Sequence, residues 1–340
     1  MTDPKPPSLL DALIPLVVLV PLLALSVTLF GADSSAGPNQ LVLLAGAAAA
    51  ALVAGKNGYK WQDIERAIVG GIGTAMRAIL ILLAVGALIG TWMMSGTVPA
   101  MIYYGLKLLN PQTFYAVTAL VCAIASLSIG SSWTVAGTLG VALVGVSMGL
   151  GLSPAITAGA IVSGAYFGDK MSPLSDTTNL AAAVADVDLF DHIRHMIWTT
   201  GPSFLIALAL FWFAGAGADV ASDGLQLSAT MSALQGSFDI TVLALLPLVV
   251  VFLMAVRKFP PLPTILFGAL LGGLTAVWLQ PDVVLAFADA PELGRGLAMT
   301  RGVWLALADG YVSATGTPAV DELLSRGGMS SMLTTVWLIL

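Results

Sequence analysis

Apolar segments long enough to cross a lipid bilayer recur along most of this chain. A spanning helix needs about 20 mostly apolar residues. Nine segments reach or approach that length: roughly 12–30, 40–55, 76–95, 113–130, 134–150, 154–168, 197–216, 240–256 and 262–279. They lack the period-2 alternation of outer-membrane strands. The sequence therefore predicts an all-α polytopic membrane protein with about nine complete transmembrane helices.

The composition excludes several other classes of protein. Charged residues make up 9% of the 340 residues, whereas soluble domains carry about 25%, so a soluble enzyme is excluded. The net charge of -6 and the lack of a basic run exclude a nucleic-acid binder. The single Cys122 excludes a disulfide framework and a multi-cysteine metal site. We expect no resident cofactor.

The two ends of the chain allow further expectations. A tenth apolar run begins near Met329 and is still apolar at Leu340. A spanning segment cannot stop in mid-bilayer with unpaired carbonyls, so we expect the natural protein to continue. The run 12–30 has an alternative interpretation as a signal peptide, but it exceeds the usual 7–15-residue apolar core. A first transmembrane helix is the better prediction.

Lysine and arginine bias predicts the orientation. Lys56, Lys60 and Arg66 indicate a cytoplasmic loop and an internal amino terminus, whereas 217–239 has aspartates without Lys or Arg and should lie outside. The region 281–328 is then expected to be an external loop.

We divide the chain into a helix pair (1–60), a first repeat with the ion-site motif (61–216), an external linker (217–239) and an incomplete second repeat (240–340). Gly70–Met76 and Arg326–Met332 resemble each other and enter apolar runs from opposite predicted sides. This is the pattern of an inverted repeat, although Gly/Met-rich entries also resemble each other by chance.

Charge returns abruptly in the middle of the chain. Between Ala78 and Gly168 the only charged residue is Lys107, and Asp169, Lys170 and Asp176 then follow closely. Ionisable groups inside a membrane are functional candidates by default. Pro173 removes a backbone donor and biases its predecessor away from helix. The sequence therefore predicts a broken or re-entrant helix at this cluster.

The side chains around this break are the oxygen donors that hard cations prefer. We expect Na+ at Asp176 first and Asp169 second. The neutral ligands would be Ser172, Thr177, Thr178 and Asn179, with Ser131, Ser132 and Thr134 facing them from a second polar interruption. Two alternatives stay open: a cytoplasmic loop anchored by Lys170, and hydroxyls that serve only helix packing. His192 and His195 favour an interfacial helix over a metal site, which would need more ligands nearby.

These motifs resemble those of the NhaC-type Na+/H+ antiporters, a family of the ion transporter superfamily. The resemblance covers roughly 60–340 and is carried by Gly130–Thr138, Ser163–Leu180 and His192–Met196, with Gly90–Pro99 and Ile102–Lys107. It implies a longer, multi-pass protein of the bacterial inner membrane whose partners are the bilayer, Na+ and H+. It leaves a homodimer open.

We therefore expect a secondary transporter, not an enzyme, that exchanges Na+, with Li+ as a further candidate, for H+. A partly desolvated aspartate can bind either ion but not both. The alternative is a Na+- and H+-coupled exchanger of carboxylates such as malate and lactate, which would need a cationic partner from Arg77, Lys107 or Lys170. A channel or a membrane sensor is a third class, but we find no soluble signalling domain.

Overall fold

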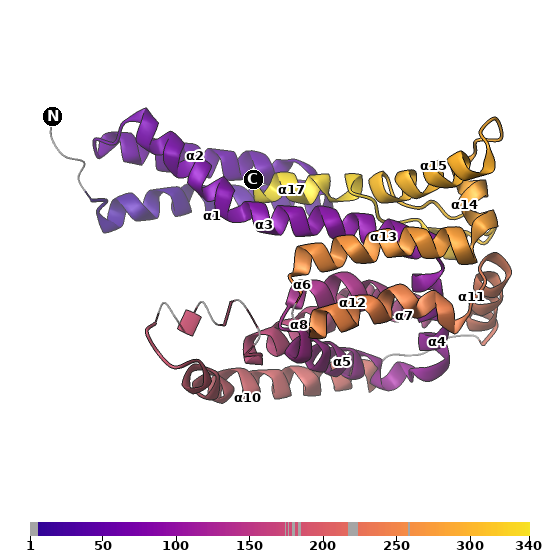
Figure 1. Ribbon diagram of the computed structural model, residues 1–340. Helices are drawn as coiled ribbons and strands as arrows, with labels where there is room; N and C mark the ends of the chain where they lie inside the picture. Colours follow the sequence, from indigo (N-terminus) through magenta and orange to yellow (C-terminus); the bar gives the residue numbers. More distant parts are fainter. Residues whose placement is uncertain are drawn as a thin grey trace. The chain divides into compact units, whose positions relative to one another are not determined.

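The computed structural model describes residues 6–340 except 174, 176, 179–180, 183–184, 217–223 and 258. Every element in this part of the chain is helical (Figure 1), apart from a single bridge between Tyr311 and Arg326. The all-α prediction is confirmed for these residues. The chain divides into two compact units, Met1–Leu82 with Met332–Leu340, and Leu83–Ser331.

The first unit contains an antiparallel pair of apolar helices, α1 (Leu9–Phe30) and α2 (Pro38–Lys56), joined by the 3-10 turn Gly31–Ala36. The pair is tied at both ends. Near the turn the Ser26 hydroxyl donates to Asn39 Oδ1 over 2.8 Å. At the open end Lys56 Nζ lies 2.8 Å from Asp11 Oδ1, so the buried Asp11 carboxylate is neutralised.

The same unit holds α17 (Leu333–Ile339), preceded by the 3-10 turn Ser330–Met332, and most of α3 (Trp61–Met94). At 1.5 Å per residue the 34 residues of α3 extend about 51 Å, well beyond a hydrocarbon core of about 30 Å. Apart from Arg77, the charged residues of α3 lie in its first turns, at Asp63, Glu65 and Arg66. These turns therefore suit the polar surroundings of the membrane better than its core.

The second unit contains the end of α3 and the remaining helices. They are α4 (Thr97–Leu108), α5 (Phe114–Ile129), α6 (Ser132–Val135), a π-helix (Ala136–Gly140), α7 (Val141–Gly149), α8 (Pro154–Met171), α10 (Leu189–Ala216), α11 (Gly224–Ser237), α12 (Leu246–Val256), α13 (Pro261–Leu279), α14 (Pro281–Ala288), α15 (Arg295–Ala308) and α16 (Pro318–Leu324). Short 3-10 turns at Pro111–Thr113 and Val242–Leu245 precede α5 and α12.

Close packing of α5 against α8 forms the centre of this unit. A Cβ atom at Gly164 would collide with the Ala119 carbonyl oxygen, and one at Gly168 with that of Ala123. The two backbones therefore meet with no side chain between them, as small residues allow in membrane helices. The buried Ser126 hydroxyl donates across this contact to the Ala165 carbonyl oxygen over 2.6 Å. α10 covers the outside of the pair.

Six helices of the described residues are long and apolar enough to span a membrane: α1, α2, α3, Ser132–Gly149, α10 and α13. Two bent pairs raise the number to eight if each is one span: Thr97–Leu108 with Pro111–Leu127, bent by 104°, and Met231–Ser237 with Val242–Ala255, bent by 90°. Among the described residues the count is therefore six to eight, against the nine expected. The runs 113–130 and 240–256 are halves of bent pairs, and 154–168 lies in α8, which carries Asp169 and Lys170.

The expected external loop at 281–328 is largely helical, since it contains α14, α15 and α16. Apart from α16, the backbone between α15 and the carboxyl-terminal 3-10 turn is irregular, and part of it passes close to α3. The Gly328 amide donates to the Gly86 carbonyl over 2.7 Å, and a side chain at Gly90 would collide with the Ala306 carbonyl. Gly327 and Gly328 have φ of 95° and 83°, which favours glycine. Whether this segment belongs to an inverted repeat stays a prediction.

Asp321 holds the loop before α16 in place. Its Oδ1 accepts from the Ser313 hydroxyl over 3.0 Å and from the Thr315 amide over 2.6 Å. Burial acts to raise the pKa of Asp321, but these hydrogen bonds outweigh it and hold the pKa below its usual range. The carboxylate is therefore a structural acceptor for this loop.

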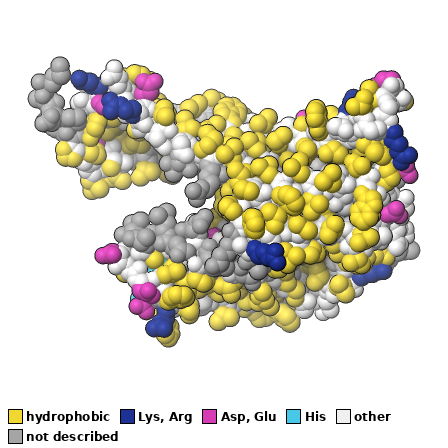
Figure 2. All heavy atoms as spheres, viewed as in Figure 1, with side chains coloured by type: hydrophobic (Ala, Val, Ile, Leu, Met, Phe, Trp, Pro, Cys, Tyr) yellow, Lys and Arg dark blue, Asp and Glu magenta, His cyan; other side chains and the backbone are white. Residues whose placement is uncertain are grey.

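Apolar side chains cover most of the visible surface (Figure 2), as expected for helices that face lipid. Leu205, Phe213 and Trp304 are 66%, 71% and 70% exposed. In water such a surface would be unfavourable. A lipid bilayer is therefore the environment in which this fold is stable.

Candidate functional site

The polar interruption after α5 is a true break between two helices. Gly130 adopts left-handed φ of 74° and ends α5, and Ser131 is extended. The Ser131 hydroxyl accepts from the Thr134 amide over 3.3 Å and from the Thr134 hydroxyl over 3.0 Å. Ser131 thus caps the amino terminus of the four-residue helix α6.

A π-helix, Ala136–Gly140, follows α6 directly, and the Thr138 hydroxyl donates to the Thr134 carbonyl over 2.6 Å. π-Helical turns inside α-helices occur frequently at functional sites, because they perturb the regular hydrogen-bond ladder. Glycines at 137 and 140 allow close packing here, since a Cβ atom at either would press on Val85 or Ile161.

The second break lies at the end of α8. Asp169 is in the last helical turn, and the residue is 8% exposed. The Ser132 hydroxyl of α6 donates to Asp169 Oδ2 over 3.0 Å. The Ser172 hydroxyl donates to the Leu127 carbonyl of α5 over 2.8 Å, which ties the two helix ends together. The two sequence interruptions therefore meet at one point.

Thr178 contacts the end of α8. Its buried hydroxyl donates to the Lys170 carbonyl over 3.1 Å. The Ser175 and Thr177 hydroxyls share a hydrogen bond of 2.9 Å, and the Thr178 amide donates to Ser175 Oγ over 3.4 Å. Ser175, Thr177 and Thr178 thus place hydroxyl groups beside the carboxyl end of α8.

The structure brings most of the described candidates together, but not all in the same way. Asp169 and Ser132 are in direct contact, and Ser172 and Thr178 bind backbone carbonyls around them. Ser131 and Thr134 lie at the start of α6 beside Ser132 and bond to each other. The side chain of Thr177 is exposed. Asp176 and Asn179 lie outside the described residues, so their predicted role stays a prediction.

Helix ends of both signs meet at this point. The carboxyl ends of α5 and α8 bring partial negative charge from their last carbonyls, and the amino terminus of α6 brings partial positive charge beside Asp169. Ion pairs among the described residues join Lys56 to Asp11, Arg66 to Asp63 and Arg194 to Asp191, and no described Lys or Arg pairs with Asp169. The buried carboxylate and the hydroxyl beside it are oxygen ligands of the kind that hard cations prefer.

Sequence reasoning overlooked part of the support for this site. It gave Ser126 no role, and it could not identify the Leu127 carbonyl as the partner of Ser172. The signal for Ser126 was a hydroxyl at an otherwise apolar helix end. The Leu127 carbonyl left no signal, since every residue has the same backbone carbonyl.

A second polar junction surrounds the break between α3 and α4. The hydroxyls of Thr91 and Thr97 donate to the Ala269 and Ala244 carbonyls over 2.9 and 2.7 Å, and Trp92 Nε1 donates to the Gly268 carbonyl over 3.0 Å. These buried donors are all satisfied by backbone groups. The junction therefore holds α3 against α13, and α4 against the 3-10 turn before α12, and these hydroxyls do not form a free ligand set.

His192 and His195 lie in the first turns of α10, where the Asp188 carboxylate accepts from the amides of Phe190 and Asp191 over 2.9 and 3.1 Å. Among the described residues no group of three or more His, Cys, Asp or Glu side chains could hold a metal ion. These histidines are placed on a capped helix start, beside an exposed Trp198. This arrangement suits an interfacial helix.

Comparison with known proteins gives a consistent result. The family described as "Na+/H+ antiporter family" matches residues 164–340. The Na+/H+ antiporter NhaC of Alkalihalophilus pseudofirmus is 41% identical over 280 residues, which are 82% of this chain and 57% of that protein. No solved structure matches this chain.

Two other relatives carry different substrates in their names. The malate-2H+/Na+-lactate antiporter of Bacillus subtilis is 38% identical over 344 residues, which are 100% of this chain and 68% of that protein. The arginine/ornithine antiporter ArcD of Halobacterium salinarum is 37% identical over 342 residues, which are 99% of this chain and 66% of that protein. This chain thus spans between 57% and 68% of the length of these three relatives.

Proposed function

Because this chain belongs to the Na+/H+ antiporter family, whose members are transporters and not enzymes, we propose that its protein exchanges Na+ for H+ across the bacterial inner membrane. Li+ is a further candidate cation. The observation that supports the proposal best is the buried Asp169 carboxylate, which contacts a hydroxyl and pairs with no described cation.

Competition between the two ions at one carboxylate is the proposed basis of exchange. Burial disfavours a bare carboxylate, and either a proton or Na+ relieves that cost. The two ions then exclude each other by charge, so loading one releases the other. Antiport requires this exclusion together with access from alternate sides.

The proposed ligands differ in the hydrogen bonds that they already make. Ser132 Oγ already points at Asp169 and would share a Na+ ion with it. Ser172 and Thr178 donate to backbone carbonyls and would act through their oxygen lone pairs. Asp176 is proposed as a second carboxylate, with Thr177 and Asn179 as neutral ligands. Ser131 and Thr134 are proposed to hold the start of α6 in position.

The decisive experiment replaces the carboxylate and keeps its shape. We expect Asp169→Asn to lower Na+ exchange driven by a pH gradient at least tenfold, measured with the full-length protein in proteoliposomes. The neutral amide cannot exchange a proton for a cation in this way. Asp188→Asn is the matched control, because Asp188 caps α10 at an exposed position. Undiminished exchange by the Asp169 variant would refute the assignment.

Exchange of small carboxylates is the second candidate, and the malate/lactate relative, which matches the whole chain at 38% identity, favours it. Against it, no described Lys or Arg forms an ion pair with Asp169, and Lys170, which follows it in the chain, is exposed. The same proteoliposomes separate the two candidates. Exchange that needs malate or lactate on either side of the membrane would favour transport of small carboxylates over simple cation exchange.

We also propose an architecture for the larger protein. We infer a first repeat at 61–216 and the start of a second at 240–340, related by inversion, with 217–239 as an external linker. The similarity of Gly70–Met76 to Arg326–Met332 supports this plan. A homodimer is compatible with it. Chemical cross-linking in native membranes would test the dimer.

A further inference from the structure

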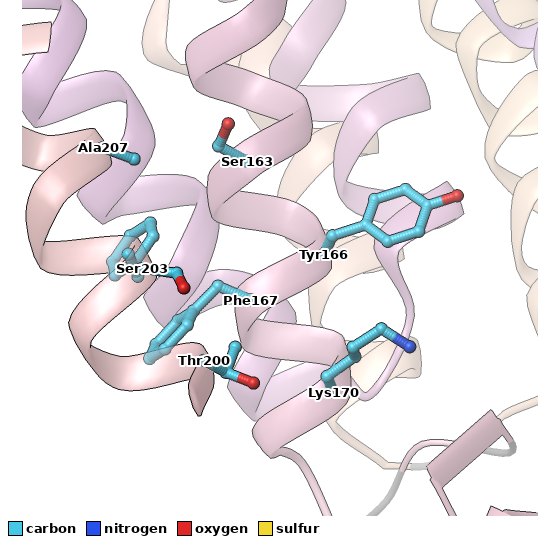
Figure 3. Close-up of a pocket in the computed structure, with 8 residues that line it drawn as sticks. Ser163, Tyr166, Phe167, Lys170, Thr200, Ser203 and Ala207 are labelled. Carbon is cyan, nitrogen blue, oxygen red and sulfur yellow. The ribbon is translucent and has the colours of Figure 1, made fainter. Parts of the chain in front are cut away.

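A groove of about 240 Å³ runs between α8 and α10 on the surface of the second unit (Figure 3). Both helices line it with residues at the same helical spacing, so that one face of each helix forms a wall. The lining residues are Ser163, Tyr166, Phe167 and Lys170 from α8, and Thr200, Ser203, Phe204 and Ala207 from α10. Nothing in the ion site described above accounts for it.

The floor of the groove is aromatic. The rings of Phe167 and Phe204 stack with centroids 4.1 Å apart and an interplanar angle of 10°. Figure 3 shows Phe167 on the side of Thr200 and Ser203. The floor is thus apolar, with hydroxyl groups beside it. Such a surface suits an amphiphile better than a small hydrophilic solute.

One end of the groove carries a positive charge. Lys170 is exposed, and it forms no ion pair within the described chain. Figure 3 shows Tyr166 and Lys170 extending on the same side of α8, as expected for residues four apart. The acid at the start of α10, Asp191, lies 3.7 Å from Arg194 and is paired with it. The groove lining therefore contains an ammonium group and a phenol hydroxyl and no carboxylate.

The position of this end along α10 matches the edge of a membrane. Trp198 is 78% exposed and stands two residues, or about 3 Å of helix rise, before the groove residue Thr200. Exposed tryptophans concentrate where headgroups meet acyl chains. From Thr200 onward α10 exposes Leu205, Leu210 and Phe213, as a lipid-facing helix does. Lys170 would then lie at the level of lipid phosphates.

We propose that the groove between α8 and α10 binds one anionic phospholipid. Its phosphate lies at Lys170 and Tyr166, and an acyl chain lies over the stacked rings of Phe167 and Phe204. Charge complementarity selects an anionic headgroup, because Lys170 is the charged residue in the lining. The site differs from the proposed ion site, since the neighbouring Asp169 is directed at Ser132 of α6.

Native mass spectrometry of the delipidated full-length protein tests this site. Phosphatidylglycerol is added in detergent and the bound lipid is counted. We expect one tightly bound phosphatidylglycerol per chain and weaker binding of phosphatidylcholine. Lys170→Gln should weaken phosphatidylglycerol binding about fivefold, the weight of one lysine beside anionic lipid. Ala207→Trp should weaken it as well, because the indole fills the groove while Lys170 is retained.

Lys107→Gln is the matched control. Lys107 also lies in a last helical turn, but its Nζ stands 4.4 Å from the centroid of the Tyr103 ring and outside this groove. Equal phosphatidylglycerol binding by the Lys170 and Lys107 variants, or equal binding of the two lipids, would overturn the proposal. So would displacement of the lipid by millimolar inorganic phosphate. Lipid binding is read directly, so failure of Na+ exchange would not affect the result.

Discussion

Ser132 and Asp169 show how much a single hydroxyl can contribute inside a membrane protein. The carboxylate lies in the last turn of α8, and the donor comes from a different helix, 37 residues earlier. A hydrogen bond to a charged group contributes about 1.5–3 kcal/mol. Because no described cation pairs with Asp169, this hydrogen bond orients the carboxylate. The same hydroxyl would also supply an oxygen to a bound cation.

Removing this hydroxyl should weaken cation binding without abolishing exchange. For Ser132→Ala we expect the Na+ concentration at half-maximal exchange to rise roughly tenfold, which corresponds to one lost hydrogen bond to a charged group. The maximal rate should change less. Ser147→Ala is the control, because the Ser147 hydroxyl is buried on α7 and bonds to Val144 of its own helix. Equal half-maximal concentrations for the two variants would contradict the role of Ser132.

At the scale of elements, the contact between α5 and α8 decides where the site residues lie. The two helices approach so closely at Gly164 and Gly168 that their ends are held side by side. Both helices end within this unit, and the hydroxyls of Ser126 and Ser172 bond across them. Two breaks that would each expose backbone groups to lipid are thus satisfied by one another.

A methyl group at this contact should loosen it. Gly168→Ala places a Cβ atom against the Ala123 carbonyl and the Leu127 amide, and overpacking of this kind costs about 1–3 kcal/mol. We expect a lower thermal unfolding midpoint in detergent. Gly159→Ala on the same helix is the matched control, since its nearest neighbour would be Phe211 Cε1 at 3.9 Å. An unfolding midpoint as high as that of the control would show that the contact tolerates a side chain.

At the scale of the whole molecule, the predicted orientation rests on charge alone. Lys56, Lys60 and Arg66 cluster between α2 and the apolar part of α3, and positive residues favour the cytoplasmic side. The helical content of 281–328 alters the number of elements after the linker, but it does not alter this bias. The orientation is therefore testable independently of the number of spans.

The lone cysteine makes such a test direct. Cys122 is fully buried, so it gives little background with a membrane-impermeant maleimide. In intact cells we expect no labelling of Lys60→Cys until the membrane is permeabilised. Gly236→Cys, at a position with nothing within 4 Å of its Cβ, should be labelled without permeabilisation. The reverse pattern would invert the predicted topology.

Whether an expectation was confirmed depended on how far apart in the chain the residues that decide it lie. The all-α class and the break near Gly130 follow from local chemistry: apolar run length and a cluster of small and hydroxylated residues. The span count did not follow, because hydropathy measures each run by itself. Run 113–130 is apolar enough to be read as a span, yet it is the second half of a pair bent by 104°.

The sequence by itself determined that this chain belongs in a membrane and that its helices break at defined residues. Those properties depend on composition and on neighbouring residues. Only the tertiary structure decided that Ser132 meets Asp169, that Ser172 caps α5 and that Lys170 faces a groove while the adjacent Asp169 faces the interior. These contacts depend on how α5, α8 and α10 pack, and packing couples residues that are far apart in the chain.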